Sequence, residues 1–109
     1  AEFIRENDGI IVCAHPYRSR PYIVNPDKDP HPAYFDGIEV YNGNRRHDSS
    51  NNIAEMWAKK HGFITTAGSD FHEYEDLARC GMVFDCFVRN SKEFRRELLK
   101  GTFELRKPD

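Results

Sequence analysis

The 109-residue sequence has no long hydrophobic run, no strong charge of either sign and no recognisable targeting segment. No uninterrupted apolar stretch approaches the roughly 18–20 residues that a transmembrane helix needs. The start Ala1-Glu2-Phe3 lacks the basic and apolar regions of a signal peptide. The 16 basic and 18 acidic residues give a formal net charge of -2, which does not indicate a nucleic-acid partner, although a local basic patch would permit one. We therefore expect a soluble protein that does not associate with a membrane.

Cysteine is also scarce, with Cys13, Cys80 and Cys86 as the only three. Their number is odd, and their spacing matches neither a disulfide framework nor a zinc knuckle. Free cysteine is among the most frequently buried residues. We expect reduced, buried thiols in a cytoplasmic protein.

The length is sufficient for one modest hydrophobic core and too short for two, so residues 1–109 are expected to form a single domain or part of one. The sequence contains no internal repeat and no low-complexity tract. Residues 1–7 resemble the last turns of an amphipathic helix, which Gly9 would end in the left-handed conformation. The chain is therefore expected to start inside an element.

Short apolar, β-branched runs alternate with helical patterns along the chain. This alternation predicts an α/β fold with mostly parallel strands, in which the runs at residues 10–14 and 63–67 are buried on both faces. The expected strands are residues 10–14, 37–41, 63–67, 81–88 and 102–106, and the expected helices are residues 48–61 and 91–100.

The first predicted helix begins with a polar cap, either Asp48 or Ser49, and ends at Gly62. Its apolar residues recur at helical spacing and are expected to face the core. These residues are Ile53, Met56 and Trp57.

The second predicted helix begins with a capping-box spacing between Asn90 and Glu93 and ends at Gly101. Its expected inner face is likewise apolar. The residues on this face are Phe94, Leu98 and Leu99.

Five of the six prolines lie between the first two predicted strands, so this stretch is expected to be a long surface loop. Loops of this length in compact domains tend either to line a functional site or to be disordered, and the sequence leaves both possibilities open. The prolines are Pro16, Pro21, Pro26, Pro30 and Pro32.

Two short histidine motifs, Ala14-His15-Pro16 and Gly68-Ser69-Asp70-Phe71-His72, each follow an apolar strand. The carboxyl ends of such strands carry the chemistry of α/β folds. Asp70 and His72 are two residues apart and would point to the same side of an extended segment, where they could share one metal or bridge two. A carboxylate with imidazoles suits zinc, manganese or iron.

Three more residues are candidates near this site. Glu39 lies in an otherwise apolar strand, and a buried carboxylate needs a partner. A metal-binding histidine or an arginine is favoured as that partner over a metal ion bound directly. Arg18 is either a phosphate-binding group or a solvated loop arginine. Asn42 either orients groups in the site or serves the turn after the strand.

The segments Gly9–Arg18, Asp36–Asn42 and Thr66–His72 together resemble the carboxyl-terminal half of a PHP (polymerase and histidinol phosphatase) domain, a family of metal-dependent phosphoesterases. The resemblance extends over roughly residues 1–105. It implies part of a distorted seven-stranded (β/α) barrel, with two or three divalent metal ions, Zn, Mn or Fe, at the carboxyl ends of the strands.

The resemblance also implies roles for individual residues. His15 corresponds to the family's metal-binding histidine of the His-Pro motif, and Asp70 and His72 correspond to its Ser-Asp-x-His ligands. Arg18 matches a position that meets the substrate phosphate in some relatives, whereas Glu39 matches a frequently acidic position that is not itself a metal ligand. The family's opening His-x-His motif, its second histidine motif and its bridging glutamate have no counterpart in this sequence.

The leading hypothesis is therefore the carboxyl-terminal portion of a phosphoesterase, inactive or nearly so by itself. Its substrate would be a phosphomonoester such as a phosphorylated small molecule, or a phosphodiester in a nucleotide or nucleic acid. An alternative is a noncatalytic PHP-like module with a structural or interaction role. A third possibility is self-association of two chains that completes the open barrel.

Overall fold

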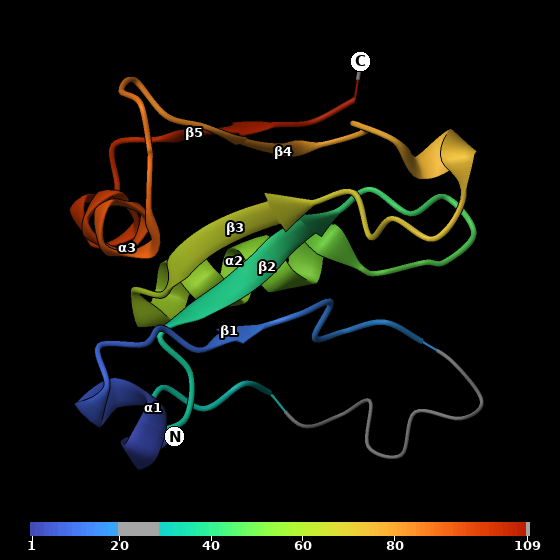
Figure 1. Cartoon of the computed structure of the whole chain (residues 1–109). Helices are drawn as coiled ribbons and strands as arrows, with labels where there is room; N and C mark the ends of the chain where they lie inside the picture. Colours follow the sequence, from blue (N-terminus) through green and yellow to red (C-terminus); the bar gives the residue numbers. More distant parts are fainter. Residues whose placement is uncertain (20–28, 109) are drawn as a thin grey trace.

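The computed structural model describes residues 1–19 and 29–108, so predictions for Pro21 and Pro26 lie outside the described residues. Two small sheets and three helices follow one another along the chain (Figure 1). In order, the elements are α1 (Glu2–Glu6), β1 (Val12–Cys13), β2 (Gly37–Asn42), α2 (Asn51–His61), β3 (Ile64–Gly68), the 3-10 helix η1 (Tyr74–Asp76), β4 (Gly81–Val83), α3 (Ser91–Lys100) and β5 (Glu104–Arg106).

The larger sheet is parallel and has the order β1-β2-β3, which confirms the predicted α/β class. Val12 pairs with Gly37, and Gly37 in turn pairs with Ile64. The register shifts between Glu39 and Tyr41, close to the carboxyl end of β2. The smaller sheet, β4 with β5, is antiparallel and was not expected as a separate unit. The described strands do not close into a barrel.

The hydrophobic core lies between β2 and α2, which packs along one face of the parallel sheet (Figure 1). Ile38 and Val40 are almost fully buried, since alternate residues of a strand point to the same face. Ala54 and Ala58 of α2 are equally buried, and Phe63 joins them where the chain turns into β3. Alanine has only a methyl group, so the helix can approach the sheet closely.

The predicted inner face of α2 was wrong for two of its three residues. Ile53 is 46% exposed and Met56 is 71% exposed, so both point away from the sheet. Trp57 does pack against the core as expected, and its Nε1 donates a hydrogen bond to the Pro30 carbonyl at 3.1 Å. The helical spacing of the large apolar residues therefore predicted the wrong inner face for α2. The helix approaches the sheet closely, and this close approach favours small residues at the interface.

The ends of α2 match the sequence only in part. The helix begins after Ser50, whose φ is 48°, so neither Asp48 nor Ser49 is its N-cap. Asp48 Oδ1 instead accepts a hydrogen bond from the Ser50 N–H at 2.9 Å, which forms a turn before the helix. Gly62 ends the helix with a φ of 69°, as predicted.

Helix α3 has the predicted bounds and caps. Asn90 accepts a hydrogen bond from the Glu93 N–H at 2.9 Å, and Gly101 ends the helix with a φ of 72°. Its predicted inner face holds only for Leu98, since Phe94 is 42% exposed and Leu99 is 53% exposed.

Several other element boundaries also differ from expectation. The left-handed residue after α1 is Asp8, with a φ of 60°, and not Gly9. Gly9 instead allows a close approach, because a Cβ there would lie 2.3 Å from Cγ2 of Ile4. Strand β1 comprises two residues of the predicted 10–14, and β4 comprises three of the predicted 81–88. The predicted burial of the first and third strands on both faces was wrong, because β1 is half-buried and only Ala67 of β3 is buried.

The three cysteines are free, but they are not all buried as expected. Cys80 is buried, Cys13 is half-buried and Cys86 is exposed. Among the described residues, no helix is both long and apolar enough to cross a membrane.

Candidate functional site

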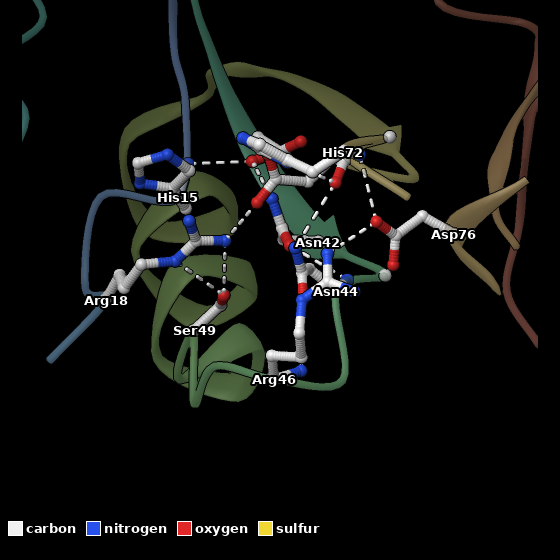
Figure 2. Close-up of polar contacts among 12 residues, drawn as sticks. His15, Arg18, Asn42, Asn44, Arg46, Ser49, His72 and Asp76 are labelled. Atoms are coloured by element: carbon white, nitrogen blue, oxygen red, sulfur yellow. Dashed lines mark hydrogen bonds and ion pairs between the residues drawn. The ribbon is translucent and has the colours of Figure 1, made fainter. Parts of the chain in front are cut away.

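The candidate site lies at the carboxyl edge of the parallel sheet, where β1, β2 and β3 all end (Figure 2). The loop after β1 supplies His15 and Arg18, β2 supplies Glu39 and Asn42, and the loop after β3 supplies the Asp70–His72 segment. Because parallel strands run in the same direction, the loops that follow them lie at the same edge of the sheet. The structure thus brings together the loops of both histidine motifs.

Arg18 is the most buried charged residue of this edge that the sequence singled out, with 6% of its surface exposed. Its Nε and Nη2 donate to Ser49 Oγ at 3.3 and 3.2 Å. Nη2 also donates to Asp70 Oδ2 at 2.6 Å. Arg18 is therefore not a solvated loop residue.

Asp70 is ionised at this edge. Burial raises the pKa of its carboxyl, but the hydrogen bond and positive charge of Arg18, with smaller contributions from Asn42 and His72, outweigh burial and leave the pKa below its ordinary value. Asp70 has a φ of 52°, an uncommon left-handed conformation for a residue with a side chain.

Glu39 has a different partner from those that the sequence favoured. Its Oε2 accepts hydrogen bonds from the backbone N–H of His15 at 2.8 Å and from Asn42 Nδ2 at 3.0 Å. In these contacts, the carboxylate orients the backbone of the His-Pro motif and not an imidazole ring. Asn42 is 5% exposed and also contacts Asn51 through its backbone, so it is part of the site and of the turn.

His72 lies against Asp70 and has a largely exposed side chain. Its Nδ1 is 2.9 Å from the Asp70 carbonyl oxygen and 3.4 Å from Asp70 Oδ1. Because a carbonyl oxygen can only accept, the shorter contact assigns the proton to Nδ1. Nε2 then carries the lone pair with which a neutral imidazole binds a metal.

Asn44, Arg46 and Asp76 also belong to this network (Figure 2). The sequence offered Arg46 only as a weaker candidate than Arg18, and it assigned no site role to Asn44 or Asp76. Asn44 Nδ2 donates to the Asp70 carbonyl at 3.2 Å, and Arg46 Nη2 donates to Asp76 Oδ2 at 2.5 Å. The hydrogen bond from Arg46, with those from the backbone of His72 and Glu73, lowers the pKa of Asp76 to about 2. Glu73 and Asp76 form a capping box in the structure. The Glu-x-x-Asp sequence departs from the usual pattern of Ser, Thr, Asp or Asn followed by Glu or Gln, so it gave no clear signal.

The predicted ligands His15, Asp70 and His72 have donor atoms that suit a metal ion, but they do not form a complete coordination sphere. Asp70 and His72 offer adjacent carboxylate and imidazole groups of the kind that zinc, manganese and iron accept. In residues 1–19 and 29–108, the predicted ligands His15, Asp70 and His72 do not form a group with ligand atoms within 4.8 Å of one another. The group that does so consists of Asp85, Cys86 and Glu97, where Glu97 is already paired with Arg96 and Lys100.

Comparison with known families bears on this site. A family model described as PHP-associated matches residues 48–103, just over half of the chain. The chain belongs to the PHP-associated family. This finding agrees with the PHP resemblance of the sequence motifs. No curated protein and no solved structure matches the chain.

The matched segment of the PHP-associated chain covers only part of the network. It includes Ser49, the Asp70–His72 segment and Asp76. Three site residues lie before this segment in the sequence, namely His15, Arg18 and Glu39. Among them, Arg18 contacts the segment directly, through Ser49 and Asp70. The site therefore joins the PHP-associated segment to the strands before it.

Proposed function

We propose that the PHP-associated chain is part of a divalent-metal-dependent phosphoesterase that hydrolyses phosphomonoesters or phosphodiesters. The observation that carries this proposal is the pairing of buried Arg18 with the ionised Asp70, beside the imidazole of His72. A guanidinium forms strong, charge-assisted hydrogen bonds with phosphate oxygens. An anion-binding group thus lies next to two residues of metal-ligand type.

In this function, the carboxylate of Asp70, the Nε2 of His72 and the ring of His15 would hold metal ions. The donors suit Zn²⁺, Mn²⁺ or Fe²⁺, and the PHP resemblance implies two or three ions in a complete site. Bound metal would supply Lewis-acid polarisation of the phosphoester and a hydroxide near neutral pH. Since three ligands are too few for such a cluster, the others would come from elsewhere in the polypeptide or from another chain.

The protein's own groups would orient the substrate. The Nε and Nη2 groups of Arg18 are engaged by Ser49 and Asp70, and these contacts leave Nη1 to meet a phosphate oxygen. Glu39 would keep His15 in place through its backbone N–H, and Asn42 would hold Glu39. These contacts support a phosphorylated small molecule or a nucleotide as substrate.

The fold part of the proposal is that β1, β2 and β3 with α2 form a section of a PHP-type (β/α) barrel. Among the described strands, β1 pairs with β2 alone and has an open edge. An open edge presents unpaired backbone groups to another strand. Further strands of the polypeptide, or a second copy of the chain, would pair there.

We also propose a cytoplasmic location, which the free thiols of the three cysteines support.

The test is metal content and hydrolysis of a generic phosphoester with Mn²⁺ or Zn²⁺. We expect bound metal that Asp70→Ala removes and the exposed-site control Glu75→Ala retains. We also expect activity only when the chain is part of a longer polypeptide extended at its amino end. Equal metal stoichiometry in wild type and Asp70→Ala would refute the ligand assignment.

A noncatalytic module is the second candidate, and one observation favours it. Asp70 Oδ2 is already bound by Arg18, and the three predicted ligands do not converge within the described residues. In that case, the ion pair would stabilise the fold only. The wild-type protein would then bind no Mn²⁺ or Zn²⁺, while Asp70→Ala would still lower its stability.

A further inference from the structure

The loop that carries Asp70 and His72 is attached at two points to the rest of the site. At the first point, Asn44 Nδ2 donates to the Asp70 carbonyl at 3.2 Å, the same oxygen that His72 Nδ1 contacts at 2.9 Å. Asn44 is 3% exposed, and its own N–H donates to Asn42 Oδ1 at 3.0 Å. The amide of Asn44 is therefore fixed relative to β2 and aimed at the loop.

At the second point, the carboxylate of Asp76 lies beneath the backbone of His72. One oxygen, Oδ2, accepts hydrogen bonds from the His72 and Glu73 N–H groups, each at 2.9 Å, and from Arg46 Nη2 at 2.5 Å. Asp76 is 3% exposed, and Arg46 is itself linked to Asn44 by its backbone N–H at 3.0 Å. The two attachment points thus belong to one connected network.

This network has a consequence for the direction of the loop's side chains. Left-handed backbone at a residue such as Asp70 is energetically unfavourable and persists only where surrounding contacts determine it. Asn44 holds the carbonyl of Asp70, and Asp76 holds the N–H of His72, so both sides of Phe71 are restrained. With those two peptide groups held, the Cα–Cβ bonds of Asp70 and His72 keep their direction relative to β2. The Asp70 carboxylate is then held by Arg18, and the His72 ring is held by its Nδ1 contact with the Asp70 carbonyl.

We propose that Asn44 and Asp76 are positioning residues for a divalent cation bound by Asp70 and His72. This inference rests on the proposed metal-dependent function. Asn44 and Asp76 touch neither metal nor substrate, and they act by holding the ligand-bearing backbone. Partners that orient metal ligands typically change metal affinity about 10–100-fold when they are removed.

The experiment is calorimetric titration of Mn²⁺ and Zn²⁺ into the wild-type protein and its variants. In Asn44→Ala and Asp76→Asn, we expect the affinity to fall about 10–100-fold. Glu75→Gln, a change of an exposed carboxylate next to Asp76, is the control and should bind as the wild type does. Thermal unfolding of the same samples shows whether each variant is folded. Should Asp76→Asn fail to fold, Asn44→Ala, which loses fewer hydrogen bonds, still tests the inference.

A second readout separates positioning from general stabilisation. The ¹⁵N shifts of the metal-free His72 ring should report the Nδ1–H tautomer in the wild type and a mixture of tautomers in Asn44→Ala. Folded variants that bind Mn²⁺ as tightly as the wild type, while Asp70→Ala does not bind, would overturn the inference alone. A wild-type protein that binds no metal would overturn the proposed function and this inference together.

Discussion

Arg18 Nη2 and Asp70 Oδ2 are 2.6 Å apart, although 52 positions separate the two residues in the chain. The guanidinium and the carboxylate are both largely buried, and Ser49 completes the contacts of Arg18. This ion pair connects the loop after β1 with the loop after β3.

Arg18→Met should destabilise the protein by about 3 kcal/mol, because it leaves the Asp70 carboxylate buried without its partner. Urea denaturation measures the change in the free energy of unfolding. The double variant Arg18→Met with Asp70→Asn should regain part of the loss, since it removes the uncompensated charge as well. Equal stability of the single and double variants would contradict this account.

Under the proposed phosphoesterase function, Arg18→Lys should weaken phosphate recognition by the longer polypeptide with its metal bound. An ammonium cannot reproduce the planar fork of a guanidinium that contacts Ser49, Asp70 and a phosphate together. We expect a rise in KM of about tenfold, which corresponds to about 1.4 kcal/mol. Steady-state kinetics give the value, with Arg45→Lys, an exposed arginine, as the matched control.

Ala58→Leu should destabilise the core by about 1–3 kcal/mol, because Ala58 is 1% exposed between α2 and the sheet and has no room for a larger side chain. Met56→Leu on the exposed face should have almost no effect. Thermal or urea unfolding measures both variants. A larger loss of stability in Met56→Leu than in Ala58→Leu would contradict this packing. It would instead support the inner face of α2 that the apolar spacing predicted.

Asn90→Ala should destabilise the protein by about 1 kcal/mol, because the Glu93 N–H at the start of α3 loses its acceptor. Ser91→Ala, one residue later at an exposed position, serves as the control. Circular dichroism during urea unfolding gives both values. A loss as large in Ser91→Ala would show that the cap is not the cause.

Stability should fall in acid through Glu93. The hydrogen bonds from the Arg89 guanidinium and backbone N–H lower the pKa of Glu93 in the folded state. A carboxyl with a lowered folded-state pKa stabilises the protein above its ordinary pKa, and this contribution is lost as the pH falls through the lowered value. Denaturation midpoints between pH 6 and pH 2 should therefore depend less on pH in Glu93→Gln than in wild type, and identical profiles would contradict the assignment.

The sequence predicted those features of this protein that depend on neighbouring residues. Apolar β-branched runs indicated β2 and β3, Asn90 and Gly101 marked the ends of α3, and Gly62 marked the end of α2. Local hydrogen bonds and backbone preferences act within a few residues, so they can be inferred without the fold.

The tertiary structure decided the features that depend on distant contacts. Close packing against β2 selected Ala54 and Ala58 as the inner face of α2, where larger apolar residues were expected. The partners of Arg18, Glu39 and Asp76 depend on which loops meet at the carboxyl edge of the sheet. The residue types and motifs by themselves determined membership of a PHP-like family and the candidate ligands His15, Asp70 and His72. Only the folded chain determined that Arg18 is bound to Asp70 and that Asn44 and Asp76 hold the loop, because those contacts depend on the parallel strands ending at one edge of the sheet.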